Sequence, residues 1–383
     1  MNLRSLPQRF ATSLVIVAGI AGVVGVLIAV LSFATGLTHA LSTTGHPDRA
    51  IVLHKQAGSE VGSSIPHDWI ATIMDGPGIA RGGDGKAIGS AEMLATVNLP
   101  RTDNGLLGAL SLRGVSAKAL ELRSETRLVD GRMFRPGLRE VIAGRGAQSR
   151  YRNLGVGSRV KFGESEWTVV GAFDSGGGAH DSELLGDLET VLSSYNRTTV
   201  NSVTVKLAGP GALEQLNAAL TKDPTLSVLV KRETAYYDEQ SKSFSGFLTI
   251  IAYFVGGIMA LGAIFAALNT MYSAVSTRTV EIATLRAIGF GAGAVVMSVI
   301  VEALLLSVIG ALIGAFIAWI FFNGNTVSSL SGAGLAQIAY QLRVGLDLVI
   351  VGIVWACVVG LIGGLFPAIR AARLPVATAL RAS

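Results

Sequence analysis

The stretch LVIVAGIAGVVGVLIAVLSF, Leu14–Phe33, decides the fold class of this 383-residue chain. Twenty residues, almost all apolar, are enough for a helix to cross the roughly 30 Å hydrocarbon core of a bilayer. No Asp, Glu, Lys or Arg occurs between Arg9 and Asp48. The alternative is a secretory signal peptide, with Thr38-His39-Ala40 as a weak cleavage site. The apolar run exceeds the roughly 7 to 15 residues of a signal-peptide core, which favours an uncleaved membrane helix.

Three more apolar stretches follow in the last third of the chain. They are Phe244–Tyr272, Ala294–Phe322 and Leu346–Phe366, the last of which ends at Pro367. The charge-free region around the first of them is longer than one span requires, so its first turns are expected to project beyond the bilayer. The sequence therefore predicts an α-helical integral membrane protein with four transmembrane helices.

Charged residues are concentrated in one part of the chain. Only 15% of all residues are charged, against about a quarter in ordinary soluble proteins. Residues 38–243 carry 23 basic and 23 acidic side chains, and the rest carries 8 basic and 3 acidic ones. No basic stripe with interleaved aromatic residues occurs, so the overall excess of positive charge does not indicate nucleic-acid binding. The single cysteine, Cys357, excludes a disulfide framework and a cysteine zinc site.

These patterns define three regions. Residues 1–37 form an N-terminal cytoplasmic segment and the first span, and residues 38–243 form an inserted extracytoplasmic domain. Residues 244–383 hold spans two to four, a cytoplasmic segment (277–290), an outer loop (323–345) and a cytoplasmic tail. The orientation follows from the excess of basic residues in short cytoplasmic segments. The short segments on the predicted cytoplasmic side contain seven basic residues and one acidic residue, Glu281. The basic residues are Arg4, Arg9, Arg278, Arg286, Arg370, Arg373 and Arg381.

The inserted domain alternates strand-like and helix-like segments, which predicts an α/β fold. Ser158–Phe173 indicates a hairpin, because β-branched and aromatic residues flank a Gly-containing turn. Val200–Leu207 and Leu226–Lys231 are expected to be strands. Gly211–Thr221, between them, has the apolar spacing of a helix.

The segment Ser276–Phe290 has the pattern of a short amphipathic helix at the cytoplasmic surface. Arg278 and Glu281 are three residues apart, which allows an ion pair, while Ile282, Leu285 and Gly289 share a second face. Periodicity alone favours equally a functional contact and a linker that lies among lipid headgroups.

Glu302 is the only ionisable residue well inside a predicted span. A carboxylate there costs roughly 2 to 3 kcal/mol on insertion scales and is expected to face other helices. We expect a role in helix packing or a dimer seam, with Asn269 of the second span as a candidate hydrogen-bonding partner. The alternative is a proton or cation site.

Motifs for catalysis or cofactor binding are not found in this sequence. Gly82–Ala87 lacks the first glycine and the Ser or Thr of a Walker A motif. The five histidines lack metal-ligand spacing, and we expect them to be solvated or in loops. The serines lack a nucleophile-elbow context. The chain is therefore expected not to be an enzyme and to bind no cofactor or metal.

Two motifs resemble a known family. RTVEIATLRAIG, Arg278–Gly289, looks like the cytoplasmic coupling segment of MacB/FtsX-type ABC transporter permeases, and Glu302–Leu306 is similar to the Glu-Ala-Leu-Leu-Leu run that follows it. The end of the chain, Pro367–Val376 with Ala379–Arg381, is similar to the family's C-terminal signature. With four spans and an insertion after the first, the resemblance covers nearly the whole chain.

The resemblance implies a permease subunit of the cell (inner) membrane that works with a separate ABC ATPase, which would hold ATP and magnesium. It also implies a second permease copy, identical or a paralogue, and suggests a periplasmic adaptor; lipid is the other expected partner. Movement driven by ATP would be passed to the outer domain and would thereby export or extract a substrate. The residues expected to make this coupling contact are Arg278, Glu281, Ile282, Thr284, Leu285, Arg286 and Gly289. An FtsX-like signalling subunit that activates an outer partner without transport is the alternative.

Overall fold

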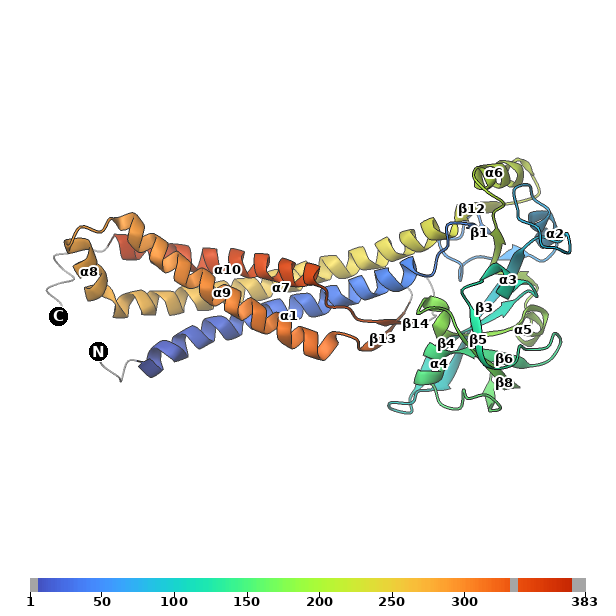
Figure 1. Cartoon of the computed structure of the whole chain (residues 1–383), viewed down its shortest axis with the longest axis horizontal. Helices are drawn as coiled ribbons and strands as arrows, with labels where there is room; N and C mark the ends of the chain where they lie inside the picture. The colour runs from blue at the N-terminus through green and yellow to red at the C-terminus, as the bar shows by residue number, and fades with distance from the viewer. Residues whose placement is uncertain (1–5, 331–336, 374–383) are drawn as a thin grey trace. The chain divides into compact units, whose positions relative to one another are not determined.

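The computed structural model describes residues 6–330 and 337–373 (Figure 1). Arg4 and the predicted tail motif beyond Arg373 lie outside the described residues. The chain divides into two compact units. The helical unit comprises Met1–Thr35, Gly246–Asn325 and Leu342–Ser383, and the α/β unit comprises Gly36–Ser245 and Thr326–Gln341.

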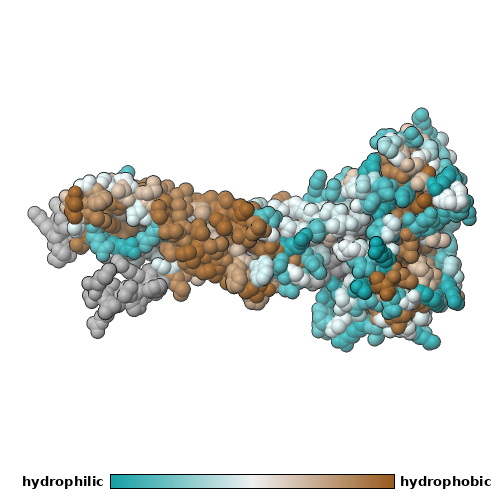
Figure 2. Space-filling view, in the orientation of Figure 1, coloured by the Kyte–Doolittle hydropathy of each residue, from teal (hydrophilic) through white to brown (hydrophobic). Residues whose placement is uncertain are grey.

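Four helices in the described residues are long and apolar enough to cross a membrane, as predicted. They are α1 (Leu6–Ser42), α7 (Glu233–Thr277), α9 (Ala292–Phe322) and α10 (Leu346–Ala372). A short helix, α8 (Thr279–Ala287), connects α7 to α9. Apolar side chains cover the middle of the helical unit in Figure 2, which fits a surface that faces lipid.

Glycines let the membrane helices approach one another closely. A Cβ atom on Gly314 of α9 would lie only 2.4 Å from the Ala21 carbonyl oxygen of α1. A Cβ atom on Gly360 of α10 would lie 1.9 Å from the Ser307 hydroxyl of α9. Small residues at such crossings allow backbone contact, which stabilises helix association in lipid.

Helix α10 extends further than the sequence indicated. The fourth apolar stretch ends at Pro367, but the helix continues through this proline to Ala372. Proline removes one helical hydrogen bond, and membrane helices tolerate this where their neighbours compensate. Pro367 is buried and Ala368 is fully buried, so packing holds the helix on both sides of the proline.

The α/β unit is built on a ten-stranded mixed sheet. In spatial order its strands are β12 (Val228–Arg232), β1 (Arg49–His54), β11 (Ser202–Lys206), β3 (Gly89–Pro100), β4 (Leu107–Val115), β9 (Glu183–Asp187), β6 (Glu140–Gly144), β8 (Ser165–Asp174) and β5 (Arg127–Gly131), and β7 (Arg159–Phe162) pairs with β8. The β4–β9 and β6–β8 pairs are parallel and the other pairs antiparallel. The antiparallel β7–β8 pair confirms the predicted hairpin.

Helices and two small strand pairs complete this unit. The helices are α2 (Trp69–Met74), α3 (Ala119–Leu122), α4 (Arg145–Arg150), α5 (Leu188–Ser194), α6 (Ala212–Lys222) and the 3-10 helix η2 (Ala179–Ser182). The small pairs are β2 (Ile65–Pro66) with β10 (Thr199–Val200), and β13 (Thr326–Leu330) with β14 (Gln337–Gln341). Helix α6 is the predicted helix, and β13 and β14 lie within the stretch predicted as the outer loop.

Side chains of successive strand residues enter two cores on opposite faces of the sheet. Val141 and Ala143 of β6 belong to the large core, whereas Ile142 between them belongs to a smaller one with Phe173. This alternation follows from the two-residue period of a strand. It explains why the strands contain continuous apolar runs.

Candidate functional site

Helix α8 and its two ends form the segment that the sequence singled out. Helix α7 ends at Thr277 and α8 begins at Thr279, with Arg278 at the junction. At the other end the Gly289 N–H donates to the Arg286 carbonyl and the Phe290 N–H to the Leu285 carbonyl, both at 3.1 Å. This is a Schellman cap, and it requires the positive φ of 109° that Gly289 adopts. Gly289 therefore ends α8 and redirects the chain into α9.

The side chains of α8 divide into a buried and an exposed set. Ile282 and Ala283 are buried against the helical unit. Leu285 is 46% exposed and Ile288 is 72% exposed. Ile282 and Leu285, which the sequence placed on one face, both line the pocket described below, Ile282 as a buried side chain and Leu285 as a half-exposed one.

The remaining predicted residues of the segment lie around this helix. The Thr284 hydroxyl donates to the Val280 carbonyl at 2.8 Å, so it satisfies the helix backbone. Glu281 is exposed and lines the pocket described below, and Arg286 is half-buried.

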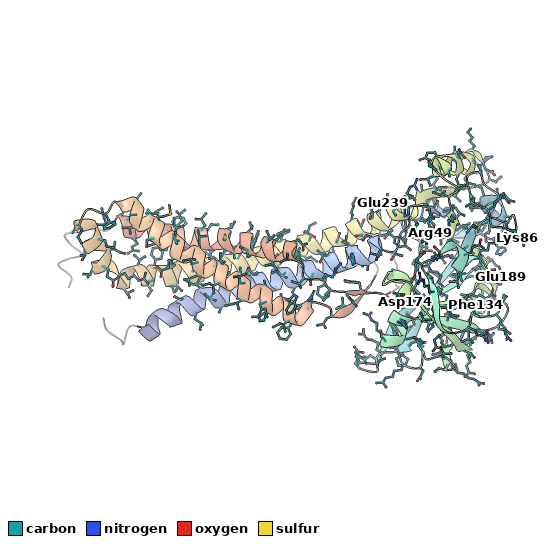
Figure 3. The ribbon with its side chains drawn as sticks, in the orientation of Figure 1. Arg49, Lys86, Phe134, Asp174, Glu189 and Glu239 are labelled. Atoms are coloured by element: carbon teal, nitrogen blue, oxygen red, sulfur yellow. The ribbon has the colours of Figure 1, made fainter. Side chains whose placement is uncertain are left out.

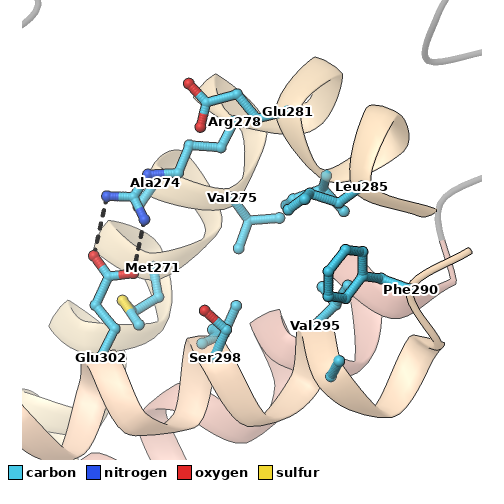
Figure 4. A pocket seen from close by; sticks show the side chains of 13 residues that line it. Met271, Ala274, Val275, Arg278, Glu281, Leu285, Phe290, Val295, Ser298 and Glu302 are labelled. Atoms are coloured by element: carbon cyan, nitrogen blue, oxygen red, sulfur yellow. Dashed lines mark hydrogen bonds and ion pairs between the residues drawn. The ribbon is translucent and has the colours of Figure 1, made fainter. Parts of the chain in front are cut away.

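Arg278 forms a two-bond ion pair with Glu302 of α9. Its Nη1 and Nη2 atoms lie 2.8 and 3.1 Å from the two carboxylate oxygens (Figure 4). The partner of Glu302 is thus an arginine from the α7–α8 junction and not the Asn269 that the sequence suggested. Asn269 lies on an exposed side of α7. The pair was missed because it joins residues 24 positions apart.

A pocket of about 330 Å³ lies between α7, α8 and α9. Met271 and Val275 of α7, Ile282 and Leu285 of α8, and Val295 and Val299 of α9 supply apolar walls. Figure 4 shows the Arg278–Glu302 pair at one end and Leu285 with Phe290 at the other. The bend between the membrane helices therefore combines an apolar hollow, exposed apolar side chains and a fixed ion pair.

Two families match this chain. The MacB-like periplasmic core domain matches residues 13–223, more than half of the chain, and the FtsX-like permease C-terminal domain matches residues 253–376. The chain is a MacB/FtsX-type ABC transporter permease. It is a membrane protein whose inserted α/β unit is the extracytoplasmic, or outer, domain of this family.

Curated relatives of the permease agree with this assignment. An uncharacterised ABC transporter permease of Methanocaldococcus jannaschii is 25% identical over 59% of this chain and 58% of its own length. The uncharacterised ABC transporter permease YknZ of Bacillus subtilis is 24% identical over 52% of this chain and 49% of its own length. The macrolide export ATP-binding/permease protein MacB of Rhodopirellula baltica is 27% identical over 51% of this chain and 28% of its own length. The chain spans about half the length, or less, of these relatives.

Two solved structures are similar to part of the permease. The extracellular domain of the noncanonic ABC-type transporter YknZ has a TM-score of 0.37 and 14% identity, and covers 48% of this chain and 99% of its own. The periplasmic region of MacB from Actinobacillus actinomycetemcomitans has a TM-score of 0.37 and 13% identity. The match covers 50% of this chain and 92% of that structure.

The outer domain of the permease contains a buried ionic cluster that the sequence analysis missed. Arg113 of β4 lies 2.7 Å from carboxylate oxygens of Glu60, Glu92 and Glu183. Arg123, which follows α3, also binds Glu92. Burial opposes ionisation of Glu92, but Arg123 and Arg113 outweigh it and hold its pKa at about 2. A charged residue in the middle of an apolar strand, as in GALSLRGV of β4, was the available signal.

His180 joins the cluster and corrects the expectation for the histidines. It is 4% exposed, and its Nδ1 lies 3.0 Å from the Glu183 carboxylate. Burial works against the charge of Glu183, yet Arg113 and then His180 lower its pKa well below the ordinary range. His180 is thus a buried member of an ionic cluster and not a solvated side chain.

The first turn of α7 is fixed to the same region. The buried Glu233 carboxylate accepts a hydrogen bond from the His46 N–H at 2.9 Å and lies 3.5 Å from Arg49. The Glu60 N–H donates to the Tyr236 hydroxyl at 2.8 Å. Figure 3 marks Arg49 inside the outer domain. Polar contacts therefore anchor the start of α7 in the sheet.

Proposed function

We propose that this permease couples ATP hydrolysis on a separate ABC ATPase subunit to movement of its outer domain, and thereby exports or extracts a substrate. The observation that carries the proposal is the exposed apolar surface of the α8 bend. Val280, Leu285, Ile288 and Phe290 are 43 to 72% exposed, on the bend that the Arg278–Glu302 pair joins to α9. An apolar surface of this kind is suited to a protein partner.

The contacts of α8 suggest how a push by the ATPase is passed on. Arg278 is bonded to α9, so displacement of α8 would carry α9 with it. Helix α7 runs without interruption from Glu233 to Thr277, and its first turn is held by the outer-domain contacts of Glu233 and Tyr236. A helix anchored in this way can transmit a tilt along its length.

The assembly we propose contains two permease copies, identical or paralogous, and two ATPase subunits that hold ATP and magnesium. The termini and α8 would face the cytoplasm, and a periplasmic adaptor would complete an export path. Export is supported by the name of the Rhodopirellula relative, a macrolide export ATP-binding/permease protein. The substrate of this chain is not implied by that name.

Co-purification with the ABC ATPase subunit that we propose as partner tests the coupling role. Leu285→Asp should weaken the contact by about 2 to 4 kcal/mol, because it places an unpaired charge in an apolar interface. Ala287→Asp adds the same charge at another exposed position of α8 and serves as the matched control. Loss of the ATPase with Leu285→Asp but not with Ala287→Asp is expected. Equal recovery with both variants would show that α8 is only a surface linker.

A further inference from the structure

The pocket between α7, α8 and α9 changes from apolar to polar along its length. Its end at the bend is formed by Leu285 and Phe290, which are 46% and 56% exposed. Its other end is formed by the Arg278–Glu302 pair (Figure 4). Glu302 lies ten residues after Ala292, the first residue of α9, which is about 15 Å along that helix. The pocket is therefore apolar at the bend and polar further along the membrane helix.

This order of polarity fits a protein side chain better than a lipid. A phospholipid places its polar groups at the membrane surface and its apolar chains in the core. A lipid chain in the pocket would set apolar carbons against the ion pair. A side chain that enters from the bend, with an apolar body and a polar tip, matches both ends. Val295 and Val299 are buried in the wall between these ends and would contact the apolar body.

The size of the pocket suits an aromatic ring. Its volume is about 330 Å³, whereas a cavity of about 150 Å³ with apolar walls is enough to bind benzene. Aromatic side chains are also the commonest anchors at protein interfaces, because one of them buries a large apolar area in a single pocket. The apolar body of the expected side chain is therefore a ring.

The ion pair determines the chemistry of the polar tip. Arg278 and Glu302 balance each other, so a charged tip would be an unpaired third ion. Within the described residues the Arg278 guanidinium binds only Glu302, and each side chain of the pair is about one-third exposed. A phenolic hydroxyl can donate to the carboxylate and accept from the guanidinium, whereas an indole N–H can only donate. The tip that satisfies both groups is that of tyrosine.

We propose that this pocket is a socket for a tyrosine side chain of the ABC ATPase. The inference rests on the proposed function, because Leu285 and Phe290 at the mouth of the socket belong to the apolar surface assigned to the ATPase. The bound tyrosine would contact the ion pair and the wall of α9 as well as α8. The ATPase would then act on α8 and α9 together and not on the surface of α8 alone.

Filling the socket tests the proposal in the full chain. Ser298 lines the pocket one turn before Glu302, whereas the adjacent Met297 is 61% exposed and does not line it. Ser298→Phe should lower recovery of the ATPase in co-purification at least tenfold, and Met297→Phe, the matched control, should stay within twofold of the wild type. If Leu285→Asp releases the ATPase but Ser298→Phe retains it, the socket is overturned and the coupling contact stands. Retention by both variants would overturn the coupling contact as well.

Small aromatic probes test the chemistry of the tip without the ATPase. Binding of 4-fluorophenol and of fluorobenzene to the purified permease is followed by fluorine NMR. The phenol should bind about tenfold more tightly, because its hydroxyl bonds to charged groups, and Ser298→Phe should abolish this difference. Equal affinity of the two probes for the wild type, or a difference that persists in Ser298→Phe, would overturn the assignment of a tyrosine to this pocket.

Discussion

Arg278 and Glu302 face each other with two nitrogen–oxygen contacts of 2.8 and 3.1 Å, so the junction before α8 is bonded to the first half of α9. Each side chain is about one-third exposed in the described structure. The only carboxylate well inside a membrane span is thereby neutralised by an arginine from the adjoining bend. This favours a packing role for Glu302 over a proton or cation site.

Exchanging the two charges tests that role. Glu302→Arg and Arg278→Glu should each reduce ATPase-coupled activity, because each places two like charges side by side. The double variant restores opposite charges and should recover part of the activity. A double-mutant cycle is expected to give a coupling energy on the order of 1 kcal/mol. Strictly additive losses would show that the pair does not act as a unit.

Arg113 is predicted to be essential for the stability of the outer domain. Arg113→Met leaves Glu60, Glu92 and Glu183 without their shared cation and should lower the free energy of unfolding by about 3 to 5 kcal/mol. Arg132→Met removes a solvent-exposed pair with Glu140 and should have little effect. Thermal unfolding of the purified protein compares the two variants. Similar melting temperatures would mean that the buried cluster contributes no more than a surface pair.

Acid should unfold the outer domain through the same cluster. Folding lowers the pKa of Glu92 from 4.5 to about 2, and that of Glu183 is lowered as well. A lowered folded pKa gives stability that is complete above the unfolded pKa and is lost as the pH falls toward the folded one. Stability should therefore decline from about pH 4.5 down to about pH 2.

Unfolding of the wild type and of Glu92→Gln across that pH range provides the measurement. The variant should be less stable at neutral pH, because the arginines lose a counter-charge. Its stability should also fall less steeply with acid, because one titrating carboxylate is gone. An unchanged slope would assign the acid sensitivity to other groups.

The orientation of the chain is predicted from the charge asymmetry of its short segments. A reporter that is active only outside the cytoplasm should work when fused near Gly211, the residue before α6. The same reporter fused after Ser383 should be silent, since the cytoplasmic side holds seven basic residues and one acid. An active C-terminal fusion would contradict the four-span topology.

The sequence by itself determined the elements that depend on local composition. Leu14–Phe33 and the three later apolar stretches predicted the membrane helices, because a bilayer leaves a long apolar segment no stable alternative to a helix. The β7–β8 hairpin and α6 were likewise visible, since their turn residues and apolar spacing are local. The bend around Arg278–Gly289 was found from its motif.

Only the tertiary structure decided which distant residues meet. The sequence suggested Asn269 as a partner for Glu302, whereas the fold pairs Glu302 with Arg278. The cluster around Arg113 gathers acids from three separate segments, which no spacing rule identifies. Helix and turn formation depend on neighbours within a few residues, but a buried charge takes its partner from whatever the packing of other segments brings within hydrogen-bond distance.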